Sequence, residues 1–183
     1  MKLELVDQRP RTGDTPLPPT QLAELVAPLG QEDWVLNLVL VEDPAMADLY
    51  SRWYGGQGVT DVLSFTYLES QGLGEPHLKE SEGQAARDLW VAPGDGAEEI
   101  TAGEVVLAPD FVARRCAQEG WDLKTEWALL LVHGALHVLG WEHQDPEQRQ
   151  AMRTHEAAVL ETQGLAHPLL HEEPEKPNEG MTD

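Results

Sequence analysis

Runs of apolar and β-branched residues predict a small β-sheet. Residues 34–41 (WVLNLVLV) are apolar at almost every position, which is typical of a strand covered on both faces. Residues 60–67 and 103–108 predict two more strands, and the weak alternation of residues 1–9 predicts an edge strand. Because these strands mix with helical segments without strict alternation, we expect an α+β fold built on a small mixed sheet.

Helix start and stop signals predict about five helices packed on that sheet. Thr20, Asp43, Asp122 and Asp145 are expected to act as N-caps, and glycines follow several of the predicted helix ends. The segment WALLLVHGALHVL is apolar on nearly every side, which indicates a buried central helix. The predicted helices cover residues 20–29, 43–54, 110–119, 123–139 and 146–163.

Composition along the chain predicts one domain with two less ordered segments. Residues 68–102 are rich in Gly, Pro, Ser and Glu and show little periodicity, so we expect a mobile loop insertion there. Residues 166–183 predict an acidic, disordered tail. A length of 183 residues then fits a single domain over residues 1–165.

The overall composition narrows the class of protein. A hydrophobic content of 41% supports a folded core and excludes a wholly disordered acidic chain. No apolar run reaches the roughly 20 residues that span a bilayer, and the start MKLELVDQRP lacks the apolar segment of a signal peptide. The single cysteine, Cys116, excludes an intrachain disulfide and a cysteine-rich metal site. We therefore expect a cytoplasmic protein that makes no membrane contact.

The charge of the chain is strongly negative. A formal net charge of −21, from 12 basic and 33 acidic residues, argues on average against binding to nucleic acid. Several basic side chains are nevertheless grouped in one stretch, at Arg114, Arg115, Lys124, Arg149 and Arg153. Charge alone leaves two interpretations open, a solubilising acidic surface and a locally basic cleft.

Three histidines near the end of the predicted central helix form the strongest chemical signal. His133 and His137 are four residues apart, so both rings project from one helix face. Gly140 ends the helix and His143 follows in the turn, which gives H-x3-H-x5-H in HGALHVLGWEH. Three imidazoles with an open fourth position are typical of a catalytic zinc site, where the ion is a Lewis acid that lowers the pKa of its water. The pattern favours a metal-dependent hydrolase, although three imidazoles also suit nickel, copper or iron.

A zinc peptidase is one such hydrolase. In HExxH peptidases a glutamate directly after the first histidine is the general base. Here that position is Gly134, so a peptidase would need another base, for instance Glu142. The histidine spacing by itself leaves the substrate open.

The sequence resembles the YbeY family of bacterial endoribonucleases. The similarity spans most of residues 34–163 and is carried by HGALHVLGWEH, TDVLSF, AGEVVLAPD and the helix entry LVEDPAM. It implies a single α+β domain in which His133, His137 and His143 hold one zinc ion and act through the water bound to it. It also implies hydrolysis of single-stranded RNA in ribosomal RNA maturation, including the 3′ end of the small-subunit RNA, and in ribosome quality control. The implied partners are RNA and the ribosome or its proteins.

Two positions depart from the family pattern. The family carries an arginine, thought to face the substrate, where this chain has Tyr54, which can stack on a base but cannot make a bidentate phosphate contact. Arg52 is close in sequence, but two residues along a helix place it on nearly the opposite side. The family usually has Asp before its third histidine, where this chain has Glu142. An alternative function is therefore a metal-stabilised ribosome-assembly binding factor with weak or no nuclease activity.

Several other side chains are candidates for supporting roles. Asp61 is a candidate to orient a water or a ligand histidine, and equally a turn-forming acid at the start of a strand. Ser64 and Arg114 are candidates for substrate contact, each with a structural alternative. Three further histidines are expected at the surface, at positions 155, 167 and 171.

Overall fold

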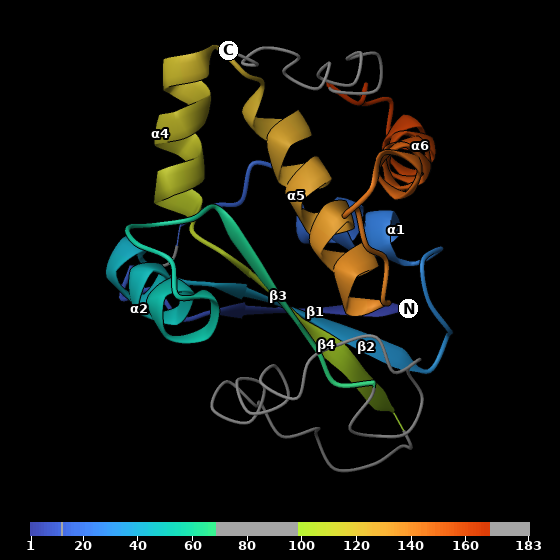
Figure 1. The fold of residues 1–183 in the computed structure, drawn as a ribbon, viewed down its shortest axis with the longest axis horizontal. Helices are drawn as coiled ribbons and strands as arrows, with labels where there is room; N and C mark the ends of the chain where they lie inside the picture. The colour runs from blue at the N-terminus through green and yellow to red at the C-terminus, as the bar shows by residue number, and fades with distance from the viewer. Residues whose placement is uncertain (12, 69–98, 169–183) are drawn as a thin grey trace, which may run out of the picture.

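A computed structural model describes residues 1–11, 13–68 and 99–168 (Figure 1). In this part of the chain, four strands form one sheet in the order β1-β2-β4-β3. β1 pairs with β2 and β2 with β4 in parallel, whereas β3 runs antiparallel to β4, so the sheet is mixed. The strands are β1 Lys2–Asp7, β2 Trp34–Leu40, β3 Val62–Thr66 and β4 Ile100–Leu107.

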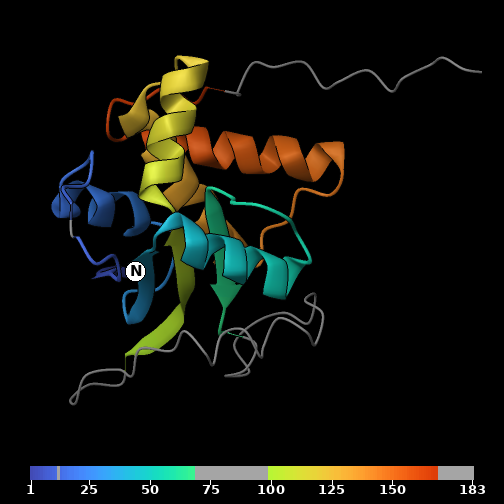
Figure 2. The ribbon, with the colours of Figure 1, turned by 90° about the vertical axis from the view of Figure 1, so that its left-hand side faces the viewer.

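Five helices in the described residues cover both faces of the sheet (Figures 1 and 2). Helix α5 lies on one face and is itself packed against α1, α4 and α6, while α2 packs on the opposite face. The predicted α+β domain with a small mixed sheet is therefore confirmed. The helices are α1 Pro19–Val26, α2 Asp43–Tyr54, α4 Pro109–Glu119, α5 Leu123–Val138 and α6 Pro146–Glu161.

The second strand is buried on both faces, as its apolar run predicted. Leu36, Leu38 and Leu40 are fully buried in the core beneath α1 and α5. Val39 belongs to the smaller core on the α2 side, together with Met46 of α2. Successive strand residues point to opposite faces, so a strand between two helical layers must be apolar at nearly every position.

Helix α5 approaches the sheet closely because it carries a glycine at the contact. A Cβ atom added at Gly134 would lie 2.8 Å from a methyl carbon of Val105 and 3.0 Å from the Ser64 hydroxyl. Any larger residue would push the helix away from β3 and β4. The glycine therefore sets the distance between the sheet and the histidines on either side of it.

Two of the four predicted N-caps hold, and two are wrong. Asp122 and Asp145 each accept a hydrogen bond from a backbone N–H three residues on, from Thr125 and Gln148 at 2.8 Å. Thr20, however, lies inside α1, which begins with Pro19. Asp43 is likewise the first residue of α2 and not its cap. Both helices carry a proline within their first two positions, where fixed φ favours the helix without a side-chain cap.

The two segments predicted to be less ordered lie mainly outside the described residues. Strand β4 begins at Ile100, so the last residues of the predicted 68–102 insertion are part of the sheet. His167, at the start of the predicted 166–183 tail, is buried against the domain. Among the described residues, no helix combines the length and apolar character needed to cross a membrane.

One carboxylate is buried inside the sheet. Glu104 of β4 has no exposed surface, lies opposite Asn37 in the β2–β4 register, and is close to Tyr67. Burial raises the pKa of Glu104 from 4.5 to about 7. The proton on Glu104 is therefore linked to the stability of the fold.

The Glu104→Gln variant should lose this linkage. With a pKa raised from 4.5 to about 7 in the folded state, protonation of Glu104 stabilises the fold fully below pH 4.5. That stabilisation is lost as the pH rises through about 7. Between pH 5 and 8, the free energy of unfolding of the glutamine variant should gain on the order of 3 kcal/mol relative to the original protein. Urea unfolding at both pH values measures this difference, and equal pH dependence of the two proteins would refute it.

Candidate metal centre and active site

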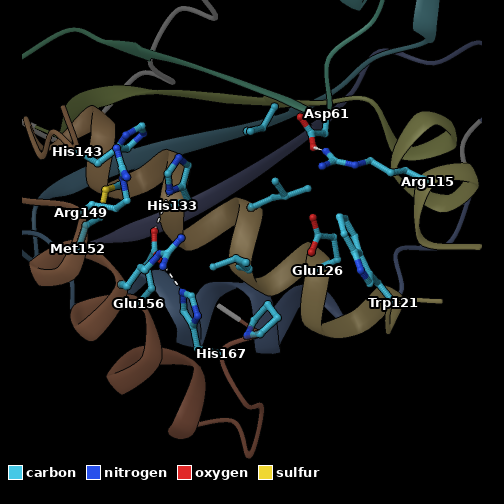
Figure 3. Close-up of a pocket in the computed structure, with 15 residues that line it drawn as sticks. Asp61, Arg115, Trp121, Glu126, His133, His143, Arg149, Met152, Glu156 and His167 are labelled. Atoms are coloured by element: carbon cyan, nitrogen blue, oxygen red, sulfur yellow. Dashed lines mark hydrogen bonds and ion pairs between the residues drawn. The ribbon is translucent and has the colours of Figure 1, made fainter. Parts of the chain in front are cut away.

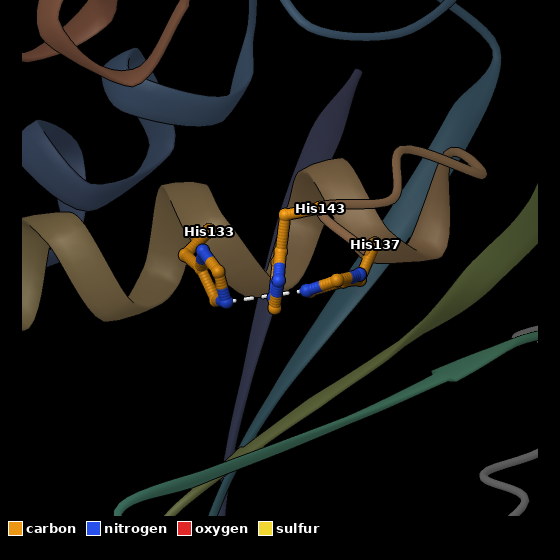
Figure 4. Close-up of side chains that lie close together, drawn as sticks. All are labelled: His133, His137 and His143. Atoms are coloured by element: carbon orange, nitrogen blue, oxygen red, sulfur yellow. Dashed lines mark hydrogen bonds between the residues drawn. The ribbon is translucent and has the colours of Figure 1, made fainter. Parts of the chain in front are cut away.

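The site begins with two rings on the buried helix. His133 and His137 of α5 are half-buried, although their immediate neighbours along the helix are buried. Their Nε2 atoms are 3.2 Å apart, and the ring centroids 4.6 Å. Figure 4 shows both rings projecting from the same side of the helix, as the spacing of four residues predicted.

A tight turn after α5 brings the third histidine back to the first two. The Trp141 N–H donates to the Leu136 carbonyl and the Gly140 N–H to the His137 carbonyl, both at 3.0 Å, and Gly140 has a φ of +89°. This pair of bonds around a left-handed glycine is the Schellman motif, which ends a helix and reverses the chain. At the other end of the turn, the Gln144 N–H donates to the Gln148 side chain. Both ends of the segment that carries His143 are therefore fixed.

The three imidazoles converge on one point. The His143 ring centroid lies 5.4 Å from that of His133 and 5.0 Å from that of His137. One nitrogen from each ring can be chosen so that all three atoms lie within 4.8 Å of one another. In a tetrahedral zinc site with bonds of about 2.0–2.1 Å, ligand nitrogens are about 3.3 Å apart. The three-histidine cluster therefore fits a metal site.

A buried glutamate orients the first of these rings. Nδ1 of His133 donates to Oε1 of Glu156 on α6 at 2.7 Å, and Nε2 of His167 donates to Oε2 at 2.8 Å. Burial alone would raise the pKa of Glu156, but the bonds from both histidines outweigh it and lower that pKa. Glu156 is therefore an ionised acceptor, which keeps the proton of His133 on Nδ1 and its Nε2 lone pair toward the other two rings.

The His137 ring is neutral at neutral pH. Burial, with the nearby His133 and His143 rings, lowers the pKa of His137 to about 4. A metal binds imidazole only in its neutral form, so this ring is ready to act as a ligand at neutral pH.

The histidines open into a pocket of about 540 Å³ between α5, β3 and the end of α2. Tyr54, Ser64 and Glu142 line it together with His133, His137 and His143. The Tyr54 hydroxyl donates to the Ser64 carbonyl at 3.1 Å, and 48% of the Tyr54 residue surface is exposed. Three of the side chains selected from the sequence thus meet beside the metal site.

Asp61 lies on the wall of a second and larger pocket. This pocket has a volume of about 710 Å³ and shares His133 and His143 with the first (Figure 3). The Asp61 carboxylate forms an ion pair with Arg115 of α4. Among the described residues, the carboxylate that contacts a ring of the cluster is that of Glu156, not Asp61.

The two remaining arginine candidates lie outside both pockets. Arg52 pairs with Asp48, one turn earlier on α2, at 2.8 Å. Arg114 pairs with Asp43 and lies 5.8 Å from the ring centre of Phe111. Neither residue lines a pocket with the histidines in the described structure.

The glycine after the first histidine, Gly134, excludes the active-site arrangement of an HExxH peptidase. Gly134 faces β4, where even a Cβ atom would lie 2.8 Å from Val105. A glutamate could not occupy this position without displacing the helix, so the general base of an HExxH peptidase has no place here. Glu142 lines the smaller pocket and is the carboxylate nearest in sequence to the ligands.

Glu156 was not among the predicted site residues, and the prediction that His167 lies at the surface is wrong. His167 is buried, with 1% of its side chain exposed. A signal was present, because Glu156 falls at the i+4 position from Met152 on the apolar face of α6. A carboxylate in the middle of a buried stripe needs a polar partner, and two histidines supply it.

Comparison with known proteins identifies related chains. A family model described as Endoribonuclease YbeY matches residues 20–164. Proteins named Endoribonuclease YbeY are 37% identical in Mycobacterium leprae and 38% identical in Nocardia farcinica, each over 126 residues. Each match covers 69% of this chain, and 62% and 60% of the respective relative. The chain thus spans less than two thirds of the length of these curated relatives.

A solved structure of lower similarity is that of TM1509 from Thermotoga maritima. It is 20% identical, with a TM-score of 0.44, and the match covers 86% of this chain and 88% of that one. Apart from the first residue of α1, the family match extends over all five described helices and over three of the four described strands, and it includes the three histidines. The chain belongs to the Endoribonuclease YbeY family.

Proposed function

We propose that the protein is a zinc-dependent endoribonuclease that cleaves single-stranded RNA. The observation that carries the proposal is the convergence of three imidazoles on one point at the wall of two adjoining pockets, in a member of the Endoribonuclease YbeY family. His133, His137 and His143 would hold the ion and leave its remaining coordination positions open to the pockets.

The metal, when bound, supplies a Lewis acid that polarises a phosphoryl oxygen and lowers the pKa of water. Side chains of the protein hold the groups that this chemistry needs in place. Glu156 holds the His133 ring in one orientation, and the turn around Gly140 holds His143. The exposed Tyr54 ring offers a face for stacking of a base, while its hydroxyl is held by the Ser64 carbonyl. Glu142 is the side chain of the smaller pocket that can accept or deliver a proton.

We also propose a place for this activity in the cell. The name shared by the relatives supports action on RNA, and the resemblance described above supports maturation of ribosomal RNA, including the 3′ end of the small-subunit RNA. Ribosome quality control, contact with the ribosome or its proteins, and a cytoplasmic location belong to the same proposal. Each follows from the family resemblance and from the composition of the chain.

One observation favours a second candidate function. Tyr54 lines the smaller pocket at the position where the family pattern has an arginine, and none of the described residues that line this pocket is Lys or Arg. Without a cation beside the metal, substrate phosphate would be held less firmly. A metal-stabilised binding factor in ribosome assembly, with weak or no cleavage, is therefore the alternative.

Substitution of a ligand should separate these functions. The protein as purified without chelators should contain close to one zinc ion per chain, and the His137→Ala variant should bind zinc far more weakly. Cleavage of a single-stranded RNA should fall by at least about 100-fold in this variant and in the original protein treated with a chelator. Elemental analysis and a gel assay of a labelled oligonucleotide measure the two effects.

The His155→Ala variant is the matched control. His155 stacks on Trp141 at 5.0 Å and lines neither pocket, so zinc content and cleavage should stay within about twofold of the original. Equal cleavage by the His137→Ala variant would show that the activity is a contaminant. Full zinc content with no cleavage by any preparation would favour the binding factor.

Loss of Glu156 should weaken metal binding without removing a ligand. We expect zinc affinity to fall about 10- to 100-fold in the Glu156→Ala variant, because the His133 ring loses the acceptor that fixes its proton and orientation. The Glu156→Gln variant should lose less, since an amide oxygen can still accept from Nδ1. Competition with a chromophoric chelator measures these affinities directly.

Glu161→Gln, at an exposed position of the same helix, should leave the zinc affinity unchanged. Circular dichroism must show that all three variants are folded. Unchanged affinity in a folded Glu156→Ala variant would contradict the role assigned to this carboxylate.

A further inference from the structure

The larger pocket continues the metal site in a direction away from Tyr54. His133 and His143 line both pockets, so a substrate bound at the metal site can extend into either pocket. Figure 3 shows the larger pocket running from His143 and Arg149 at one end to Arg115 and Trp121 at the other. Its wall is formed by α4, α5 and α6, with Asp61 directly before β3.

This pocket gathers positive charge in a strongly acidic protein. Three of the 12 Lys and Arg residues of the chain line it, namely Arg115, Arg149 and Arg153. Arg149 and Arg153 are one turn apart on α6, so both extend from the same side of the helix. In a chain with a net charge of −21, this placement puts two cations of α6 in the pocket that His133 and His143 line, and a third, Arg115, at its far end.

Two of the three carboxylates of the pocket are engaged by other side chains, and the third is partly buried. Asp61 is paired with Arg115, and Glu156 accepts from two histidines. Burial raises the pKa of Glu126, which favours its neutral form more than in water. On α6, the pocket is therefore lined by two arginines, Arg149 and Arg153, and by one carboxylate whose two oxygens already accept hydrogen bonds.

The far end of the pocket holds an exposed aromatic side chain. Trp121 has 42% of its surface exposed, which places it among the few large apolar residues exposed in the described structure. The Arg115 guanidinium carbon lies 4.9 Å from the centre of the Trp121 ring, and its ion pair with Asp61 holds it there. An indole braced by an arginine and open to solvent is suited to stacking of a base.

We propose that the pocket between α4, α5 and α6 is the track of the single-stranded RNA on one side of the scissile phosphate. Arg149 binds the backbone near the metal, and Trp121 stacks a base at the far end. This inference rests on the proposed function, and it locates the phosphate-binding cation on α6 instead of at position 54. A site that combines a cation for phosphate with an aromatic ring for base stacking favours a nucleic acid strand over an acidic peptide, which has no bases to stack.

The test is the affinity for a fluorescent single-stranded oligoribonucleotide, measured by anisotropy with a chelator present so that the probe is not cut. The Kd should rise about 5-fold for Arg149→Gln, and the slope of log Kd against log salt should fall by about one. For Trp121→Ala the Kd should rise about 10-fold with an unchanged salt slope. In zinc-loaded enzyme, both variants should raise KM with kcat within about twofold.

Arg11→Gln is the charge-matched control, because Arg11 is exposed and lines neither pocket. Its Kd should stay within about twofold of the original. Wild-type affinity in both pocket variants, an equal loss in the control, or no binding of RNA by the original protein would each overturn the proposal. The proposed function can fail independently of this inference. If zinc-loaded protein binds RNA through Arg149 and Trp121 but never cuts it, RNA cleavage is refuted while the RNA-binding role of this pocket stands.

Discussion

The close packing of helix α5 on the sheet is the constraint on which the site depends. Gly134 removes the side chain that would separate the helix from Val105, so the histidines at positions 133 and 137 sit against β3 and its neighbours. The helix is buried along most of its length, and polar rings on it must find partners. The rings of His133 and His137 contact each other, and the turn after the helix brings His143 against them. His133 also donates to Glu156.

The sequence carried enough information to predict the architecture and the ligand set as hypotheses. Apolar runs located strands β2 to β4, and the cap-and-glycine signals located all five described helices, because these patterns reflect local backbone chemistry. The Schellman turn at Gly140 was also local, so the return of His143 followed from the spacing. The wrong caps at Thr20 and Asp43 arose where proline had taken over the role of a side-chain cap.

What the sequence could not supply were contacts between distant segments. Glu156 reaches His133 from 23 residues away, and Asp61 meets Arg115 across 54 residues. No periodicity within one element reports such a pair, which explains why Asp61 was considered for the role that Glu156 has. The same limit applies to the larger pocket, whose arginines come from two helices and become neighbours of the histidines only in the folded chain.

The central claim is that three imidazoles of this chain hold one metal ion and leave it open to a substrate. X-ray absorption at the zinc edge of the zinc-loaded protein tests it most directly. The account predicts about three imidazole nitrogens at roughly 2.0–2.1 Å, together with one or two oxygen ligands. A shell of oxygens without the scattering of imidazole rings would place the metal on surface carboxylates and contradict the account.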